Sequence, residues 1–389
     1  MPGVHAILSA SSAKRWMSCP PSARLEEKLR ERFGDRSSPF AEEGTHAHAL
    51  AELKLQKEIG LINDFSFKAQ RAEMTVDSEM EWATDRYVDI VMQKYYEAKK
   101  NCPDAQIFIE QRLDFSDWVP HGFGTGDVVI VSDSILEVCD LKYGKGVPVV
   151  AEKNPQARCY GLGALSAYGD LYGFKSVRNT IIQPRLDSVT EETLTREELI
   201  RWAEEELKPK AELAWRGLGE YDPGDHCRFC AARALCYHRA AKCMQIFDTG
   251  MQNPGILPDE EIPRILEVAD IAEAWIQDIR DYAKSQALKG QHWPGFKLVA
   301  GRRPPRKWLN AEAVIDQMSR AGYSDEQIYK PRELISVGEA EKLMGKPAFR
   351  AILGQFSVQG AGAPTLVPES DKRLSINSSE AAFADLVEN

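Results

Sequence analysis

The stretch LEVCDLKYG places an acid and a base at a spacing that suits a hydrolytic metal site. Asp140 and Lys142 are two residues apart, so on a strand both side chains leave the same face, while Leu141 points the other way into the core. A carboxylate can hold a divalent cation, and an adjacent ammonium group can stabilise the negative charge that grows during hydrolysis. An isolated Asp-x-Lys pair is more often without function, with an aspartate that caps a turn or points to solvent. The metal-site hypothesis therefore needs further ligands.

A second aspartate can be aligned with the first by counting across an expected hairpin. GTGDVVIVSDSILEVCDLKYG indicates two strands around a turn, and if an even-numbered loop is centred between Asp133 and Ser134, Asp127 lies opposite Asp140. Two facing carboxylates destabilise a sheet unless a cation lies between them. Hard oxygen ligands favour magnesium or manganese there. An odd-numbered loop would put the two aspartates on opposite faces.

A helical stretch, EEGTHAHALAEL, offers a further ligand. His48 lies four residues after Gly44 and four before Glu52, and residues four apart share a helix face. A neutral imidazole beside a glycine suits metal coordination and a close approach to the sheet. A lone histidine is more often structural, and His46 competes for the role.

A second helical stretch, NPQARCYGLGAL, places Gln156 and Tyr160 on one face, where together they can hydrogen-bond a phosphate or orient Lys142. In chain order, the motifs resemble those of the RecB-like branch of the PD-(D/E)XK nuclease superfamily: Gly44-x-x-x-His48, Gly126-Asp127, Asp140-x-Lys142 and Gln156-x-x-x-Tyr160.

This resemblance spans roughly residues 9–240 and implies a role for each matching residue. It also suggests that Glu110, on the strand before the hairpin, belongs to the rim of the site, ranked below the others. The implied roles are cation binding by His48, Asp127, Asp140 and the Leu141 carbonyl, positioning or activation of the attacking water by Lys142, and support by Gln156 and Tyr160.

The stretch DHCRFCAARALC contains three cysteines, Cys227, Cys230 and Cys236, one fewer than a closed four-thiolate site needs. Some RecB-like nucleases, including AddB-type subunits and CRISPR-associated iron–sulfur exonucleases, have one cysteine before the nuclease core and three after it in a similar run. By that resemblance Cys19, in RWMSCPPSA, would be the fourth ligand of a 4Fe–4S cluster. Such a cluster would join the first helix to the end of the core.

The alternative is a structural zinc ion. Zinc sites usually pair cysteines with two to four residues between them, and the second spacing of five fits that poorly. His226, His238 and Cys243 lie near enough in sequence to replace a ligand, although Cys243 is treated as a bystander. The cluster is the preferred interpretation, and zinc stays open.

Composition restricts the class of protein. The chain has 389 residues and a net charge of −10, which argues weakly against long-range attraction of a polyanion because local basic patches decide affinity. No apolar run approaches the ~20 residues of a membrane helix, and the start lacks the apolar core of a secretory signal. We expect a soluble protein in the cytoplasm of a bacterial host cell.

Hydrophobic periodicity predicts an α+β fold with a restriction-endonuclease-like core, in which helices come first and flank a central mixed sheet built on the hairpin. Helices are expected at 9–33, 40–56, 74–100, 154–172, 194–217 and 257–288, and strands at 106–115, around the hairpin and at 176–186. Residues 1–245 would form the nuclease domain, and 246–389 a mostly helical extension of unknown role with a flexible tail from about 360.

Two glycine patterns and one basic stretch carry weaker signals than these motifs. GFGTGD precedes a strand and opens no helix, so it is no dinucleotide loop, and it is expected to let the backbone turn near DNA. No G-x-x-x-x-G-K-[ST] motif occurs, so the chain has no helicase motor of that type. AGRRPPRKW either contacts phosphates and stacks on a base or is a solvated loop; its candidates are Arg302, Arg303, Arg306, Lys307 and Trp308.

Taken together, the motifs indicate a metal-dependent DNA exonuclease of phage or prophage type, processing DNA ends in recombination or repair. A phage single-strand-binding or annealing protein is the expected partner. Two alternatives remain open: a non-catalytic DNA-binding protein on a degenerate nuclease core, and a zinc-containing protein-interaction module.

Overall fold

The computed structural model describes residues 6–33, 39–170, 172–248, 259–330 and 333–358, and beyond these 360, 362, 364–368, 373, 375 and 376. They belong to two compact units, Met1–Trp275 and Ile276–Asn389. The functional boundary expected after residue 245 stays a prediction, and most of the tail from 360 lies outside the described residues.

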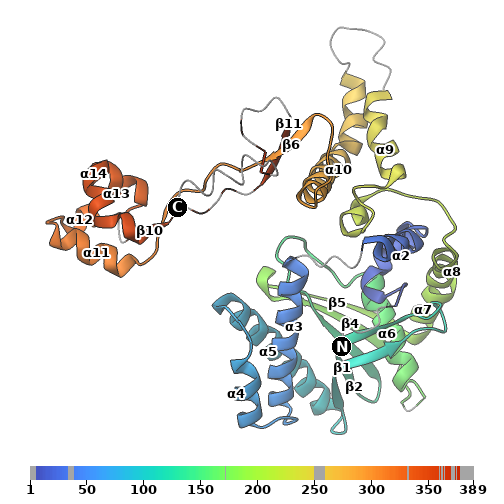
Figure 1. Cartoon of the computed structure of the whole chain (residues 1–389). Helices are drawn as coiled ribbons and strands as arrows, with labels where there is room; N and C mark the ends of the chain where they lie inside the picture. Colours follow the sequence, from blue (N-terminus) through green and yellow to red (C-terminus); the bar gives the residue numbers. More distant parts are fainter. Residues whose placement is uncertain are drawn as a thin grey trace. The chain divides into compact units, whose positions relative to one another are not determined.

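The first unit is built around a five-stranded mixed sheet in the order β1-β2-β3-β4-β5 (Figure 1). All neighbouring strands are antiparallel except β3 and β4, which are parallel. This arrangement, flanked by helices, confirms the α+β class expected from the sequence. The strands are β1 (Gln106–Asp114), β2 (Phe123–Val131), β3 (Ile135–Leu141), β4 (Ser176–Gln183) and β5 (Ser188–Thr195).

Helices cover both faces of the sheet (Figure 1). One face packs into a core with α6 and the N-terminal helix, through residues such as Trp16, Leu113 and Val129. The other face packs against α3 and α5, through residues such as Leu55 and Val128. The helices of this unit are α1 (Ala13–Ser18), α2 (Ser22–Phe33), α3 (Pro39–Glu58), α4 (Asp64–Ala72), α5 (Ser78–Asn101), α6 (Pro155–Tyr168), α7 (Arg196–Trp202), α8 (Lys208–Arg216) and α9 (Tyr237–Asp248), with α10 (Ile262–Leu288) running on into the second unit.

The β2–β3 hairpin has the register that was counted from the sequence. Val128 pairs with Cys139 and Val131 with Leu136, and the turn closes with Ser132 N donating to Ile135 O at 3.2 Å. The loop is therefore even-numbered and centred between Asp133 and Ser134. The expected positions of Asp127 and Asp140 on facing strands are confirmed.

The helix α6 begins where its sequence predicts. The Asn154 side chain accepts from the backbone N–H groups of Gln156 and Ala157, and Pro155 occupies the first turn, where its missing N–H costs nothing. On the sheet side a Cβ added to Gly163 would lie 2.9 Å from the backbone of Leu113, so only glycine lets this helix approach β1 so closely. The helix thereby sets Gln156 and Tyr160 over the sheet.

Among the elements not expected from the sequence are the helix α4 and the edge strand β5 of the first unit. β5 has the polar sequence SVTEETLT. Its Glu192 carboxylate accepts two hydrogen bonds from Arg158 of α6, from Nε at 2.8 Å and from Nη2 at 2.6 Å. This strand of threonines and glutamates is therefore held by its pairing with β4 and by the Arg158–Glu192 ion pair.

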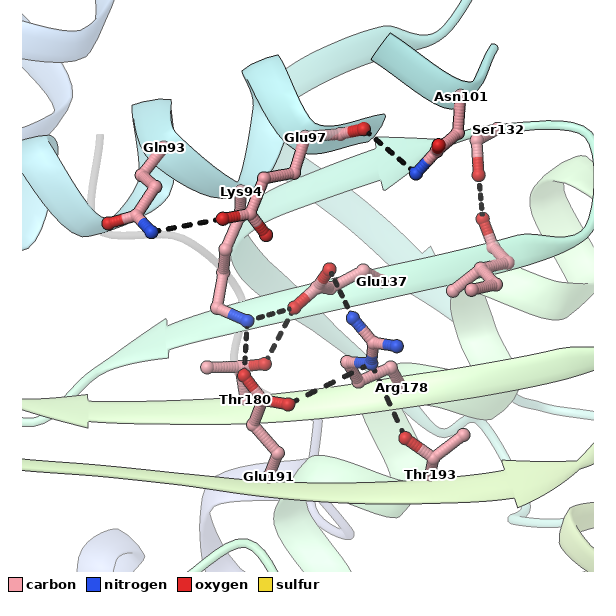
Figure 2. A network of polar contacts seen from close by, with 11 residues as sticks. Gln93, Lys94, Glu97, Asn101, Ser132, Glu137, Arg178, Thr180, Glu191 and Thr193 are labelled. Carbon is pink, nitrogen blue, oxygen red and sulfur yellow. Dashed lines mark hydrogen bonds and ion pairs between the residues drawn. The ribbon is translucent and has the colours of Figure 1, made fainter. Parts of the chain in front are cut away.

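A group of charged side chains lies between α5 and strands β3–β5, with Glu137 buried and Glu191 at the exposed edge (Figure 2). Glu137 Oε1 accepts hydrogen bonds from Lys94 Nζ at 2.7 Å and from Thr180 Oγ1 at 2.8 Å. Arg178 lies 3.6 Å from Glu137 Oε2, and Lys94 also pairs with Glu191. We call these five residues the Glu137 network. Its two cations face two carboxylates, so the buried charges compensate one another.

The second unit has its own small core around Val314, Met318, Ile328, Phe349 and Leu353. Its helices are α11 (Ala311–Arg320), α12 (Asp325–Ile328), α13 (Val337–Met344) and α14 (Lys346–Leu353). Its strands form three pairs: β6 (Phe296–Val299) with β11 (Thr365–Pro368), β7 (Lys307–Trp308) with β10 (Ser357–Val358), and β8 (Tyr329–Lys330) with β9 (Glu333–Leu334).

In the part of the chain that the structure describes, no helix combines the length and apolar character needed to cross a bilayer.

Candidate metal centre and cysteine site

Three carboxylates lie in one row across adjacent strands. On β1 and β2, Ile109 pairs with Val128 and Gln111 with Gly126, so Glu110 is opposite Asp127. The hairpin register then sets Asp127 opposite Asp140. We call Glu110, Asp127 and Asp140 the carboxylate row. Like charges opposite one another destabilise a sheet, so the row requires compensation by positive charge.

Glu110 has an unusual backbone for a strand residue, with φ at 50°. A left-handed conformation is costly for a residue with a side chain, and such outliers gather at functional sites. Burial, reinforced by the negative charges of Asp127 and Glu52, raises the pKa of the Glu110 carboxyl to about 7. Without an added cation, the Glu110 carboxyl is therefore protonated in part of the molecules near neutral pH.

His48, from α3, reaches the row from the helical side. Its Nδ1 lies 3.1 Å from Asp127 Oδ1, while Asp127 Oδ2 accepts from Leu141 N at 2.6 Å. Burial lowers the pKa of His48, but the charge and hydrogen bond of Asp127 outweigh burial, and the pKa is raised. One potential ligand atom each from His48, Glu110 and Asp127 lie within 4.8 Å of one another, so these three can hold a metal ion.

Asp140 and Lys142 form an ion pair beside this triad. Lys142 Nζ lies 2.6 Å from Asp140 Oδ2, and the Asp140 side chain is buried. Burial raises the pKa of Asp140, while Lys142 acts in the opposite direction. The ammonium group thus lies next to the carboxylate row, as the Asp-x-Lys spacing requires. Leu141, between the two residues, is fully buried in the core that the sheet forms with α3 and α5, which we call the second core. The metal-binding role of the Leu141 carbonyl stays a prediction.

The helix α6 contributes the two remaining expected residues. Gln156 Nε2 donates to Tyr160 Oη at 3.4 Å, and burial together with the charge of Asp140 raises the pKa of Tyr160. The Tyr160 ring fills the space over Gly124, where an added Cβ would lie 2.7 Å from Tyr160 Cε1. Gly124 and Gly126 of GFGTGD therefore belong to strand β2 and make room for packing, which differs from the backbone turn expected there, while Gly122 lies just before the strand. Gly44 serves no close approach, because a Cβ there would meet nothing within 4 Å.

Glu110 is the residue that the sequence ranked too low as a possible cation ligand. The hairpin turn reveals the register of β2 against β3, but residues 115–122 separate β1 from β2, so no tight turn reveals the second register. The sequence feature that could have pointed to Glu110 is its place as an acidic residue inside the expected strand QIFIEQRLD.

The four expected cysteines surround one small cavity, although Cys19 comes from the first helix and the others from 227–236. Cys19, Cys227, Cys230 and Cys236 all line it. Burial raises the pKa of Cys19 and of Cys227, and raises that of Cys230 to about 12.

Polar contacts tie the N-terminal helices to the cysteine segment. Arg15 Nη1 donates to Phe229 O at 2.9 Å, and Arg15 also pairs with Glu26 at 2.6 Å. Glu26 in turn accepts from Ala231 N at 2.6 Å. These contacts bring the upstream and downstream cysteines together independently of any bound group.

The other possible ligands near the cysteines differ in position. His226 lines the cavity, and burial lowers its pKa. His238 stacks on Tyr221 with the ring centroids 4.0 Å apart, and Cys243 is buried without lining the cavity. His226 is therefore the better placed of the three for replacing a cysteine.

The basic candidates lie in the second unit, where two of them are engaged in its packing. Arg306 pairs with Glu341 and lies over the Phe349 ring, 4.7 Å from its centroid. Trp308 Nε1 donates to Ile335 O at 3.0 Å. Arg302 and Lys307 are exposed on the chain surface. The DNA-binding role of the stretch, including Arg303, stays a prediction.

A family model described as "Protein of unknown function (DUF2800)" matches residues 5–374 of this chain. A solved structure titled "Crystal structure of SSO0001" is similar to 55% of this chain and 94% of that chain, with 14% sequence identity and a TM-score of 0.20. A likeness at that score supports no argument about fold or function.

Proposed function

Since the chain belongs to the DUF2800 family of proteins of unknown function, we propose its activity from its own residues: a divalent-metal-dependent DNA nuclease. The observation on which the proposal rests is the carboxylate row, with His48 at one end and Lys142 beside Asp140. Three carboxylates there face one lysine and one histidine, so the site has an excess of negative charge that a divalent cation would balance.

Each residue has a role that its contacts support. His48, Glu110 and Asp127 would hold magnesium or manganese, with Asp140 and the Leu141 carbonyl as the further ligands implied by the resemblance. A bound cation supplies Lewis-acid stabilisation of the phosphate and lowers the pKa of the attacking water. Lys142 would orient that water and stabilise charge in the transition state.

Two α6 residues would complete the site. Tyr160 keeps its proton because its pKa is raised, so its hydroxyl can donate to a phosphate oxygen. Gln156, which donates to Tyr160, would hold that hydroxyl in place.

The choice of DNA as substrate, and of ends rather than internal bonds, rests on the ordered motif set that resembles the RecB-like nucleases. The proposed setting is the cytoplasm of a bacterial cell, in phage recombination or repair, beside a single-strand-binding or annealing protein. A role of Arg302, Arg303, Arg306, Lys307 and Trp308 in binding DNA belongs to this proposal as well.

The four cysteines would hold a 4Fe–4S cluster. The spacing Cys227-x2-Cys230-x5-Cys236 fits the paired cysteines of a zinc site poorly and favours a cluster, in which each thiolate binds a different iron. The cluster would link α1 to the segment after the core as a structural element.

The nuclease proposal is tested with end-labelled linear DNA and closed circular DNA, in Mg²⁺, in Mn²⁺ and in EDTA. We expect release of label from linear DNA with either cation and none in EDTA. Asp127→Asn should abolish the reaction in a protein that remains folded by circular dichroism. Binding of DNA without cleavage by the wild-type protein in both cations would contradict the proposal and favour a DNA-binding protein on an inactive nuclease core.

The cluster is tested separately by metal analysis and visible absorbance of anaerobically purified protein. We expect about four irons per chain, a broad absorbance that Cys19→Ala abolishes, and a full cluster in the matched control Cys243→Ala. Stoichiometric zinc without iron would contradict the cluster and leave the nuclease proposal untouched.

A further inference from the structure

Tyr87, on α5, is a buried phenol whose hydroxyl is left without a partner. The side chain is 1% exposed, and its ring packs in the second core with Leu55, Val128 and Leu141. Within the described residues, Tyr87 Oη has no hydrogen-bond partner. A buried hydroxyl in that state costs stability, and a phenylalanine would fill the same apolar space without that cost. Packing therefore explains the ring and leaves the hydroxyl unexplained.

The position of Tyr87 indicates where the hydroxyl can act. Tyr87 lines one small cavity together with His48, Glu110 and Asp127, and the cavity has room for about one water molecule. Burial, together with the negative charges of Asp127, Asp140 and Glu110, raises the pKa of Tyr87 well above its usual value. The phenol accordingly keeps its proton at every working pH, and can always donate.

Glu110 is the member of the carboxylate row that most needs orienting. Its backbone is in the left-handed region, and no described side chain donates a hydrogen bond to its carboxylate. Asp127, by contrast, is held by Leu141 N and His48, and Asp140 by Lys142. A donor on the cavity wall would restrict Glu110 in the same way.

We propose that Tyr87 is a positioning residue of the metal centre: its hydroxyl donates to Glu110 through one water in the shared cavity, and holds that carboxylate in the orientation that binds a divalent cation. The inference rests on the proposed metal site and adds to it a residue outside the sequence motifs. Partners that orient metal ligands typically change metal affinity by 10- to 100-fold when removed.

The test compares Tyr87→Phe with Tyr143→Phe. Tyr143 is a suitable control, because it is 3% exposed and its Oη also lacks a partner among the described residues. The charges around it differ, since they belong to Arg185, Asp77, Glu43 and Glu79 and not to the carboxylate row. Mn²⁺ alone is titrated calorimetrically into each full-length protein without DNA, with Asp127→Asn as the baseline. Thermal unfolding is measured without Mn²⁺.

For Tyr87→Phe we expect Mn²⁺ affinity to fall by about 10-fold, with an unchanged or higher unfolding temperature in the absence of metal. Tyr143→Phe should leave Mn²⁺ affinity unchanged. In a Glu110→Gln background, Tyr87→Phe should have no further effect on affinity, because the hydroxyl acts through Glu110.

Three results would overturn the inference. Wild-type affinity in Tyr87→Phe removes the role of the hydroxyl while the metal site stands. A fall in unfolding temperature without metal assigns the hydroxyl a structural role instead. A wild-type protein that binds no Mn²⁺ overturns the metal site itself, and the role of Tyr87 with it.

Discussion

Two groups of acidic side chains on strand β3 differ in how their charge is balanced. Glu137 and Asp140 are three residues apart, and each is 5% exposed. In the Glu137 network, Lys94 and Arg178 face Glu137 and Glu191 (Figure 2). In the carboxylate row, three acids face only Lys142 and His48 among the described residues in contact with them. The first group is complete as it stands, whereas the second has a charge excess that a cation would remove.

The comparison suggests a general distinction between a structural and a functional buried charge. A balanced network with its hydrogen bonds made has no use for a further ion. An unbalanced row destabilises the metal-free protein, as the raised pKa values of Glu110 and Asp140 indicate. Such a row is typical of a site where a bound ligand offsets the destabilisation. Three predictions separate the two groups, in order of decreasing effect.

The largest effect is on catalysis. Asp140→Ala should lower the nuclease rate per folded molecule by about 10³-fold or more, because it removes a carboxylate next to the cation and the partner of Lys142. Glu137→Ala, on the same strand and equally buried, should leave the rate within about 3-fold at a temperature at which it is folded. Initial rates on end-labelled DNA measure both, and equal losses in the two variants would remove the distinction.

The order reverses for stability. Glu137→Ala should lower the free energy of unfolding by about 3 kcal/mol, because Lys94, Arg178 and Thr180 lose a buried partner. Asp140→Ala should cost less than about 1 kcal/mol, because it relieves the burial of a charge and frees the partly exposed Lys142 to reach solvent. Urea unfolding without metal measures both values. A larger loss in Asp140→Ala than in Glu137→Ala would contradict this assignment.

The smallest effect depends on pH. The pKa of Glu110 in the folded protein, about 7, lies above the ordinary value of 4.5. The folded state therefore binds more protons between those pH values, and Glu110 makes stability fall as pH rises from 4.5 to 7. Glu110→Gln should remove that loss and raise the free energy of unfolding by on the order of 1–2 kcal/mol at pH 8, allowing for partial exposure.

At pH 4, where Glu110 is protonated in both states, the same substitution should change stability little. Metal-free unfolding at the two pH values measures the difference. An equal effect at pH 4 and pH 8 would show that Glu110 does not titrate in this range. The two buffers are matched in ionic strength and contain no divalent cation, because a bound cation would itself displace the proton from Glu110.

The elements that the sequence predicted well share a local cause. The β2–β3 hairpin was placed to the residue because turn length and side-chain alternation set its register within one short segment. The helix α6 lies within the stretch predicted to be helical, and its own cap, Asn154, and Pro155 fix its start locally. The edge strand β5 was missed because its polar sequence becomes a strand only beside β4, with Arg158 from α6 neutralising Glu192.

The sequence by itself determined that Lys142 shares a face with Asp140, and it placed Asp127 opposite Asp140 on the condition of an even-numbered loop, because a hairpin register and a strand period are local properties. The tertiary structure alone decided that Glu110 lies opposite Asp127 and that Tyr87 reaches the same end of the sheet. His48 and the four cysteines were expected at their sites only through the family resemblance, and it is the fold that brings each set together. Those groups come from segments joined by long connections. Their meeting depends on how two cores pack on opposite faces of one sheet, which no local spacing encodes.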